Sequence, residues 1–407
     1  MAGILSYVPG AGRLMGLQKP RSINLEPVQV HQIETNPDRR ARCLKHLLKA
    51  NHVNYSIVYH DLHFVNHNAH LLSSAYLLGA TDVHLHALYE SEVKELEPWT
   101  PSPAEVVDTD WRDFWGDKHY QRAYVDFFED KLAMTYNYDW KREVDHFLFS
   151  GEEPLFYGLT GGLGHVLIHL GYAYEMDCKE IAMEALGLAC VEYNFLSKYF
   201  ADSSYTRPSS VSGTPLELLT KMSEDPRFDK FPKEIDFDQI EGLFEKHQDL
   251  ILEYWNAWNL DDPTEQFRLS QEAAVSLVVA TVKPDSHAYN FFVVHLLTSS
   301  HAVRILLPYF PPQHRITLVR EWWLFAIMVF IIKGRPQPNP DNIKDGIGGR
   351  DWKYVDNQGL NSPWSKDAHY VKALRAFKEA AATWGDDDQV YIRSALTFVD
   401  NFDGWRF

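Results

Sequence analysis

From residue 37 onward, hydrophobic residues recur mostly three and four positions apart, the spacing that places them on one face of an α-helix. Alternating, β-branched runs typical of strands are almost absent, so the expected fold class is all-α. Asn36-Pro37-Asp38 has the composition of a helix start. The segments with the clearest helical pattern are 177–199, 236–257, 263–282, 287–307, 314–333, 365–384 and 387–402.

The same pattern predicts the domain organisation. Residues 1–36 lack a sustained period and are expected to form an irregular N-terminal arm, and residues 37–407 a large single-domain helical bundle with a buried site and long irregular loops. The Pro-dense stretch 201–234 is either a domain boundary or a surface excursion of one bundle. We favour the excursion, because histidine-bearing segments lie on both sides of it. The stretch 335–362 is long enough to form a lid or binding loop.

Composition and charge exclude several classes of protein. Lys+Arg 39 against Asp+Glu 56 gives a net charge of −17, which disfavours nucleic-acid binding and anionic membrane surfaces. The longest apolar run, Trp322 to Ile332, is far short of the ~20 residues that span a bilayer. Three scattered cysteines and a poor secretory signal predict a cytoplasmic or other intracellular location. Organelle targeting is the alternative, because no acidic residue precedes Glu26.

Several common cofactor motifs are missing. The Gly-rich stretch Gly158–Gly164 does not satisfy G-x-G-x-x-G and follows no predicted strand, so a Rossmann site for a flavin or nicotinamide is unsupported. Neither a Walker A motif, a G-x-S-x-G elbow nor an H-E-x-x-H zinc motif occurs. The ferritin-like di-iron pattern needs Glu-x-x-His twice, and the chain has it once, at Glu143 and His146.

The chain contains 19 histidines, and several lie inside strongly apolar helical segments. Residues three or four apart share a helix face, whereas His295 and His301 differ by about 240° around the axis. One imidazole from each segment could meet around a divalent transition metal, since neutral imidazole binds such ions. The alternative, equally supported by spacing alone, is a set of hydrogen-bonded core histidines. The segments pair His67 with His70, His165 with His169, His295 with His301, and His369 with Lys372.

These segments also carry a family resemblance. The ordered motifs are Asn66-His67-x-x-His70 followed by Tyr76-Leu-Leu-Gly-Ala80, Tyr124-Val-Asp-Phe-Phe128, Gly161-Gly-Leu-Gly-His165 followed by His169-Leu-Gly-Tyr-Ala173, His301-Ala-Val-Arg304, and His369-x-x-Lys372. Together, over about residues 40–385, they resemble the questin oxidase-like family of fungal secondary metabolism. No single motif is specific, but the ordered set is. The resemblance implies that residues 37–407 form one questin oxidase-like catalytic domain.

The resemblance implies oxidative cleavage of the central ring of an anthraquinone-type polyketide with O₂. Members of the family are described either as NADPH-dependent Baeyer-Villiger-type oxidases or as non-haem iron oxygenases with histidines and a carboxylated lysine as ligands. The missing flavin fingerprint and the clustered histidines favour Fe²⁺ and make the NADPH-dependent enzyme the alternative. A non-catalytic helical scaffold that binds a pigment intermediate is a third possibility.

The resemblance also implies site residues. The expected metal ligands are His70, His165, His295, His369 and Lys372, with His67 and His301 in reserve as ligands or supporting residues. Lys372 fits because a buried lysine has a lowered pKa and can add CO₂ to form an anionic carbamate. Arg304 is expected to orient a phenolate or quinone oxygen, or else to pair with a structural carboxylate. His169 is expected to be a pocket or packing residue, and Gly158–Gly164 to allow close backbone approach.

Overall fold

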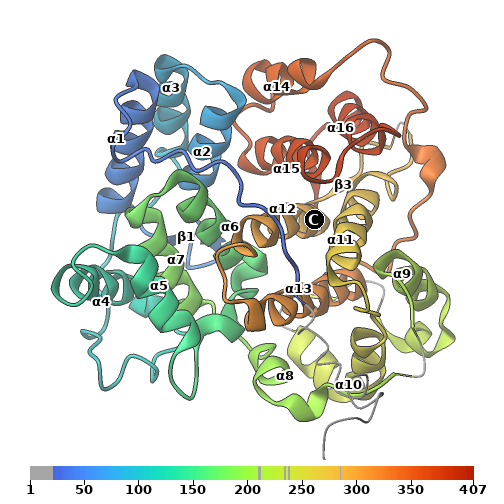
Figure 1. The fold of residues 1–407 in the computed structure, drawn as a ribbon, viewed down its shortest axis with the longest axis horizontal. Coiled ribbons are helices and arrows are strands. Elements are labelled where there is room, and N and C mark those ends of the chain that lie inside the picture. Colours follow the sequence, from blue (N-terminus) through green and yellow to red (C-terminus); the bar gives the residue numbers. More distant parts are fainter. Residues whose placement is uncertain (1–21, 210–211, 233–234, 237–238, 285) are drawn as a thin grey trace, which may run out of the picture.

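Helices form most of the computed structural model, which describes residues 22–209, 212–232, 235–236, 239–284 and 286–407 (Figure 1). The all-α prediction is confirmed. The helices are α1 (Arg39–Asn54), α2 (Asn68–Leu78), α3 (Asp82–Glu92), α4 (Gln121–Met134), α5 (Trp140–Phe149), α6 (Gly161–Met176), α7 (Lys179–Val191), α8 (Ser197–Ala201), α9 (Pro215–Glu224), α10 (Ile240–Asn256), α11 (Pro263–Val279), α12 (Phe291–Leu306), α13 (Pro312–Ile332), α14 (Trp352–Asn361), α15 (Ala368–Trp384) and α16 (Val390–Asn401).

The strands of the described residues are each two residues long. Strand β1 (Val58–Tyr59) pairs antiparallel with β2 (Phe64–Val65), and β3 (Tyr289–Asn290) pairs parallel with β4 (Trp405–Arg406). The second pair joins the start of α12 to the C-terminal residues. It therefore fixes the last residues of the chain beside the first turn of α12.

Several helix starts follow directly from capping chemistry. The Asp38 side chain accepts hydrogen bonds from the backbone N–H groups of Arg40 and Ala41, so α1 begins where the sequence predicted a helix start. Pro263 and Pro312 are the first residues of α11 and α13. Proline is favoured there, because the first backbone N–H groups of a helix have no partner within it.

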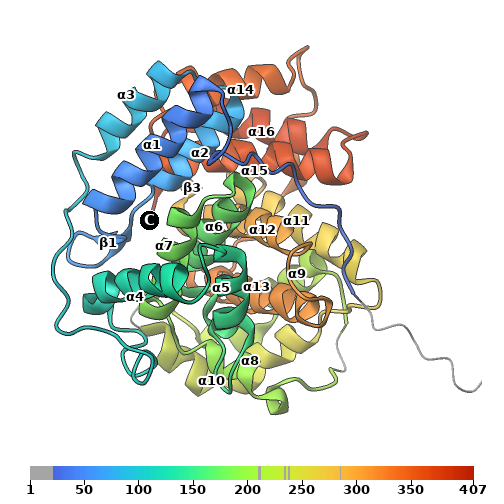
Figure 2. The ribbon, with the colours of Figure 1, turned by 60° about the vertical axis from the view of Figure 1, so that its left-hand side comes forward.

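Helices α6 and α12 lie in the middle of the molecule in both ribbon views (Figures 1 and 2). They approach closely, because a Cβ atom at Gly171 of α6 would lie 3.2 Å from the Cβ atom of Ala302 on α12. Helices α2, α6, α12 and α15 also pack against one another, α2 on α6, α12 on α15 and α15 on α2. One continuous hydrophobic core includes residues of all four helices.

Two stretches contain more regular structure than the sequence suggested. The Pro-dense stretch 201–234 holds α9, which begins with a capping box between Thr214 and Glu217. This helix packs on α11 and buries Leu218 and Leu219. The stretch 335–362 is irregular only in its first part, because the Asp351 side chain caps α14.

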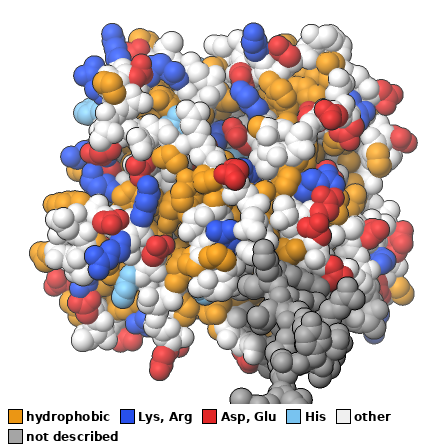
Figure 3. All heavy atoms as spheres, viewed as in Figure 1, with side chains coloured by type: hydrophobic (Ala, Val, Ile, Leu, Met, Phe, Trp, Pro, Cys, Tyr) orange, Lys and Arg blue, Asp and Glu red, His pale blue; other side chains and the backbone are white. Residues whose placement is uncertain are grey.

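The outside of the molecule bears on two further expectations. None of the helices within the described part of the chain is long and apolar enough to cross a bilayer. The face in Figure 3 shows acidic and basic side chains interspersed around a middle region of exposed hydrophobic side chains. The described part of the expected N-terminal arm, from Ser22, contains no helix before α1, and residues 1–21 lie outside the described residues.

Candidate metal centre

Four imidazoles from four helices meet in the core. They belong to His67 at the N-cap of α2, His165 on α6, His295 on α12 and His369 on α15. One ring nitrogen from each residue lies within 4.8 Å of the others. The Nε2 atoms of His67 and His165 are 2.7 Å apart. All four side chains are buried or nearly so, with at most 9% of a residue exposed.

The outward nitrogens of two of these imidazoles are already engaged. The Nδ1 atom of His165 donates to the carbonyl oxygen of Gly162, and that of His295 donates to the carbonyl oxygen of Phe291 at 2.8 Å. A neutral imidazole carries one N–H, so the Nε2 atoms of His165 and His295 then present lone pairs to the centre of the cluster. This tautomer is the one that a metal bound through Nε2 requires.

The electrostatic environment keeps these imidazoles neutral. Burial, followed by the nearby ammonium of Lys372, holds the pKa of His67 and His369 well below the usual value, and it lowers the pKa of His295 to about 3. Burial and the neighbouring His67 do the same for His165. Neutral imidazole is the metal-binding form, so the cluster needs no deprotonation before it accepts a cation.

Lys372 lies one turn beyond His369 on α15 and is 2% exposed. Its Nζ atom has no hydrogen-bond partner among the described residues. Burial lowers the pKa of this amine to about 7. An unpartnered buried amine beside four imidazoles fits the expected carbamate ligand, because carboxylation would turn a repelled cation into an anionic oxygen donor.

His70, which the resemblance placed among the ligands, occupies a different position from the four clustered residues. Its Nε2 atom is hydrogen-bonded to Nδ1 of His169 at 2.8 Å, and its ring stacks on that of His165 with centroids 6.0 Å apart. His169 in turn contacts Glu184 at 2.7 Å, so it belongs to a polar network rather than to apolar packing. His67, held in reserve in the sequence analysis, takes the position expected of His70.

His301 and Arg304 lie apart from the cluster, as the six-residue spacing from His295 implied. Burial, followed by the charges of Arg375 and Arg304, holds the pKa of His301 well below its usual value. Neither ring nitrogen of His301 has a hydrogen-bond partner among the described residues. Arg304 donates from Nε to Thr383 Oγ1 at 3.0 Å. Both residues are buried near the ion pair between Arg375 and Glu175.

The Gly-rich stretch forms an unusual turn at the start of α6. Gly162, Leu163 and Gly164 all have positive φ, at 56°, 58° and 79°. A Cβ atom at Gly164 would lie 3.1 Å from the Cβ atom of Ser299 on α12, so the backbone approaches α12 closely, as expected. The turn also presents the Gly162 carbonyl to His165. A hollow of about 250 Å³ borders Gly162 and Leu163 on the other side.

Three residues beside the cluster carried no sequence signal. The Phe291 ring lies 4.6 Å from that of His369, and Trp405 lies 6.2 Å from it. The Nε1 atom of Trp405 donates to Asp367 Oδ2 at 2.8 Å, and Asp367 caps α15 just before His369. The C-terminal strand therefore covers one side of the cluster with aromatic rings.

The fold and the cluster together define an all-α protein with a buried, imidazole-rich candidate metal centre. Residues 64–377 match the model of the questin oxidase-like family. Because this match covers most of the chain, the protein belongs to the questin oxidase-like family, and it is an oxidoreductase.

Three relatives illustrate matches over most of both chains. A Baeyer-Villiger oxidase of Pestalotiopsis microspora is 24% identical over 84% of this chain and 82% of its own. A Baeyer-Villiger oxidase of Emericella nidulans is 23% identical over 92% of this chain and 90% of its own. The questin oxidase of Aspergillus terreus is 24% identical over 83% of this chain and 80% of its own.

Proposed function

We propose that this protein is a non-haem iron-dependent oxygenase that cleaves the central ring of an anthraquinone-type polyketide with O₂. The observation that carries the proposal is the convergence of four imidazole nitrogens from four helices within 4.8 Å of one another. Without a cation, each close Nε2 pair must share a proton, and a pair without one would place two lone pairs face to face, at a cost of about 1–3 kcal/mol for each unpaired group.

The donor set fits iron. His67, His165, His295 and His369 would hold the ion through Nε2, with His67 in place of His70, and carboxylated Lys372 would supply one anionic oxygen. Neutral imidazole suits Fe, Cu, Zn and Ni, and among these we propose Fe²⁺ because the proposed reaction uses O₂. When bound, Fe²⁺ supplies the one-electron chemistry toward O₂ that amino-acid side chains lack.

The substrate class is inferred from the relatives, since questin oxidase names one of them. The residues around the cluster suit a flat aromatic ligand. Phe291 and Trp405 present aromatic rings to His369 on one side of the cluster, with ring centroids 4.6 and 6.2 Å from that of His369. Arg304 and His301 lie farther from the donor set, where they would hold polar groups of the substrate or of the protein.

The second candidate is an NADPH-dependent Baeyer-Villiger-type oxidase of the same substrates, favoured by the names of two of the relatives above. The strands of the described residues are only two residues long, so this part of the chain has no doubly wound sheet for a dinucleotide. A non-catalytic scaffold would bind the polyketide without turnover.

The test begins with metal analysis after anaerobic loading with Fe²⁺ and removal of loosely held metal. We expect about one iron per chain and, on admitting O₂ and a hydroxyanthraquinone, ring-opened product without NADPH. Product that forms only with stoichiometric NADPH consumption, in protein without iron, would establish the second candidate. Well-folded protein that holds no iron and yields no product would establish the non-catalytic scaffold as the function.

A further inference from the structure

A continuous chain of four hydrogen bonds leads away from the candidate metal centre. It runs from His70 on α2 to His169 on α6 at 2.8 Å, and from His169 to Glu184 on α7 at 2.7 Å. From Glu184 it continues to His52 on α1 at 2.9 Å, and from His52 to Glu129 on α4 at 3.0 Å. His169 and His52 each use both ring nitrogens, and His70 uses Nε2.

The inner end of this chain lies beside the cluster. His70 is fully buried, and its Nδ1 atom has no hydrogen-bond partner among the described residues. Its ring meets that of His67 edge-on with centroids 5.3 Å apart. The chain of hydrogen bonds therefore begins directly beside the cluster.

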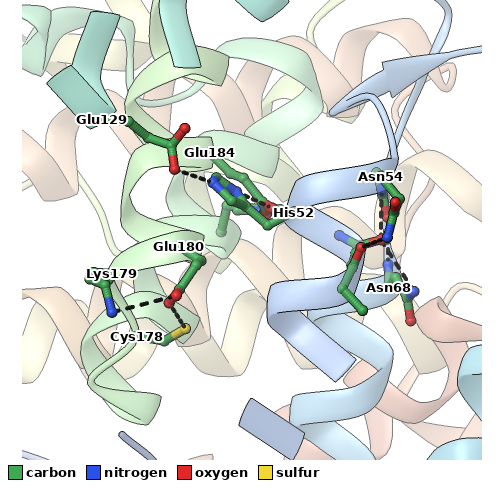
Figure 4. A network of polar contacts seen from close by, with 12 residues as sticks. His52, Asn54, Asn68, Glu129, Cys178, Lys179, Glu180 and Glu184 are labelled. Atoms are coloured by element: carbon green, nitrogen blue, oxygen red, sulfur yellow. Dashed lines mark hydrogen bonds and ion pairs between the residues drawn. The ribbon is translucent and has the colours of Figure 1, made fainter. Parts of the chain in front are cut away.

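The outer end lies in solvent. The side chain of Glu129 is 44% exposed, whereas those of His52, Glu184 and His169 are 4%, 3% and 1% exposed. Figure 4 shows this outer half, with His52 held between Glu184 and Glu129. The five side chains therefore connect the core to the surface through groups that can all both accept and donate a proton.

We propose that His70, His169, Glu184, His52 and Glu129 form a proton path between the active site and solvent. The inference rests on the proposed function, because oxidation of a phenolic substrate moves protons inside a buried site. The structure supports a path rather than a purely structural network on two grounds. One end has an unpartnered nitrogen on a ring that meets His67 edge-on, and the other is a half-exposed carboxylate.

The proton balance along the path closes. When His70 binds a proton at Nδ1, it gives up its Nε2 proton to Nδ1 of His169. His169 in turn gives up its Nε2 proton to Oε2 of Glu184. His52, charged at rest, then passes its Nε2 proton to Glu129, which releases it to water. One proton enters and one leaves, and the ion pair of Glu184 and His52 becomes a neutral pair, so no net charge accumulates in the core.

The resting charges fit this sequence. Burial alone would lower the pKa of His52, but its hydrogen bonds to Glu129 and Glu184 raise it to about 10. Burial would raise the pKa of Glu184, but hydrogen bonds from His169 and His52 lower it. Glu184 is therefore an anion and His52 a cation at neutral pH.

The variant Glu129→Gln tests the path at its surface end, where the fold is least at risk. We expect iron content and melting temperature to match the wild type. We also expect single-turnover ring opening to slow at least about tenfold, with a larger solvent isotope effect and partial rescue by added imidazole. Asp130→Asn, an exposed neighbour on α4, is the matched control and should retain the wild-type rate.

A second readout needs no turnover. In metal-free protein, the pKa of His52 followed by NMR should fall by at least one unit in Glu129→Gln and stay unchanged in Asp130→Asn. If Glu129→Gln is iron-loaded and has the rate and isotope effect of the wild type, the proton path is overturned and the proposed function is not. Loss of iron in that variant would also overturn it, by making the chain structural support. A wild type without iron and turnover would reject the proposed function and the path together.

Discussion

The Nε2 atoms of His295 and His369 lie 3.1 Å apart, although the residues are 74 positions apart in sequence and belong to α12 and α15. Two imidazole nitrogens at this distance share either a proton or a cation. The Nδ1 atom of His295 already donates to the Phe291 carbonyl, so its Nε2 atom is an acceptor. The state of this contact therefore links the occupancy of the centre to the packing of two core helices.

Iron binding should for this reason stabilise the fold. A ligand that binds only the folded state at a free concentration 100 times its Kd adds about 2.7 kcal/mol. We expect Fe²⁺ to raise the melting temperature by a few degrees and a chelator to reverse the increase. His295→Ala should lose this response, and His86→Ala, at an exposed position on α3, should keep it. Equal melting temperatures with and without iron would contradict the prediction.

Lys372→Ala should lose iron and activity together. The variant removes the amine that would carry the carbamate, so bicarbonate or acetate should restore part of the bound iron by entering the vacated volume. Lys378→Ala is the control, because Lys378 lies on the same helix and forms a partly exposed ion pair with Asp356 at 2.7 Å. Full iron occupancy in Lys372→Ala, measured by metal analysis, would rule out the lysine as a ligand.

The fold was readable from the sequence where local chemistry determines it. Asp38 caps α1 where expected, and Pro263 begins α11 at the first residue of the predicted segment 263–282. The stretch 177–199 was predicted as one helix, but α7 ends at Val191 and α8 begins at Ser197. Hydrophobic spacing continues through such a break, so it cannot reveal where the backbone leaves the helix.

The site was less readable, because long-range packing decides which histidine of each pair points inward. Helical spacing places His67 and His70 on one face, but His67 lies at the N-cap with φ −94° and ψ 0°, just outside α2. His70 instead meets His169, which is tied to Glu184 on another helix. The family resemblance supplied the residue types, and only the packing of α2, α6 and α7 assigns their partners.

The turn at the start of α6 should tolerate no side chain at Gly164. Its φ of 79° is unfavourable for other residues by about 1–2 kcal/mol, and a Cβ atom would lie 3.1 Å from that of Ser299. We expect Gly164→Ala to cost about 2–4 kcal/mol of unfolding free energy in urea denaturation, once overpacking is included. Gly242→Ala on α10, where a Cβ atom meets nothing within 4 Å, should be neutral or stabilising.

The buried ion pair between Glu175 and Arg375 should show strong coupling. Their side chains are 4% and 1% exposed. Glu175→Leu leaves an uncompensated buried charge and should cost about 3–5 kcal/mol of unfolding free energy. Adding Arg375→Met should recover most of this loss, because no charge then remains. A double variant as unstable as the sum of the single variants would contradict the coupling.

Glu143 should make stability fall as pH rises. Its residue is fully buried on α5, and neither carboxylate oxygen has a hydrogen-bond partner among the described residues. Burial raises the pKa of this carboxyl from 4.5 to about 8. Between these two values the folded protein holds a proton that the unfolded chain has released, so the unfolding free energy decreases with pH over this window and levels off above it.

Glu143→Gln removes this dependence while keeping the shape of the neutral acid. Near pH 4 the variant should match the wild type, and at pH 8 or above it should be more stable by about 2–4 kcal/mol, since each unit of pKa shift corresponds to about 1.4 kcal/mol. Glu90→Gln, at an exposed position on α3, is the control. Urea denaturation at pH 4, 7 and 9 provides the measurement. A difference between Glu143→Gln and the wild type that stays constant with pH would show that the Glu143 carboxyl is ionised in the folded protein.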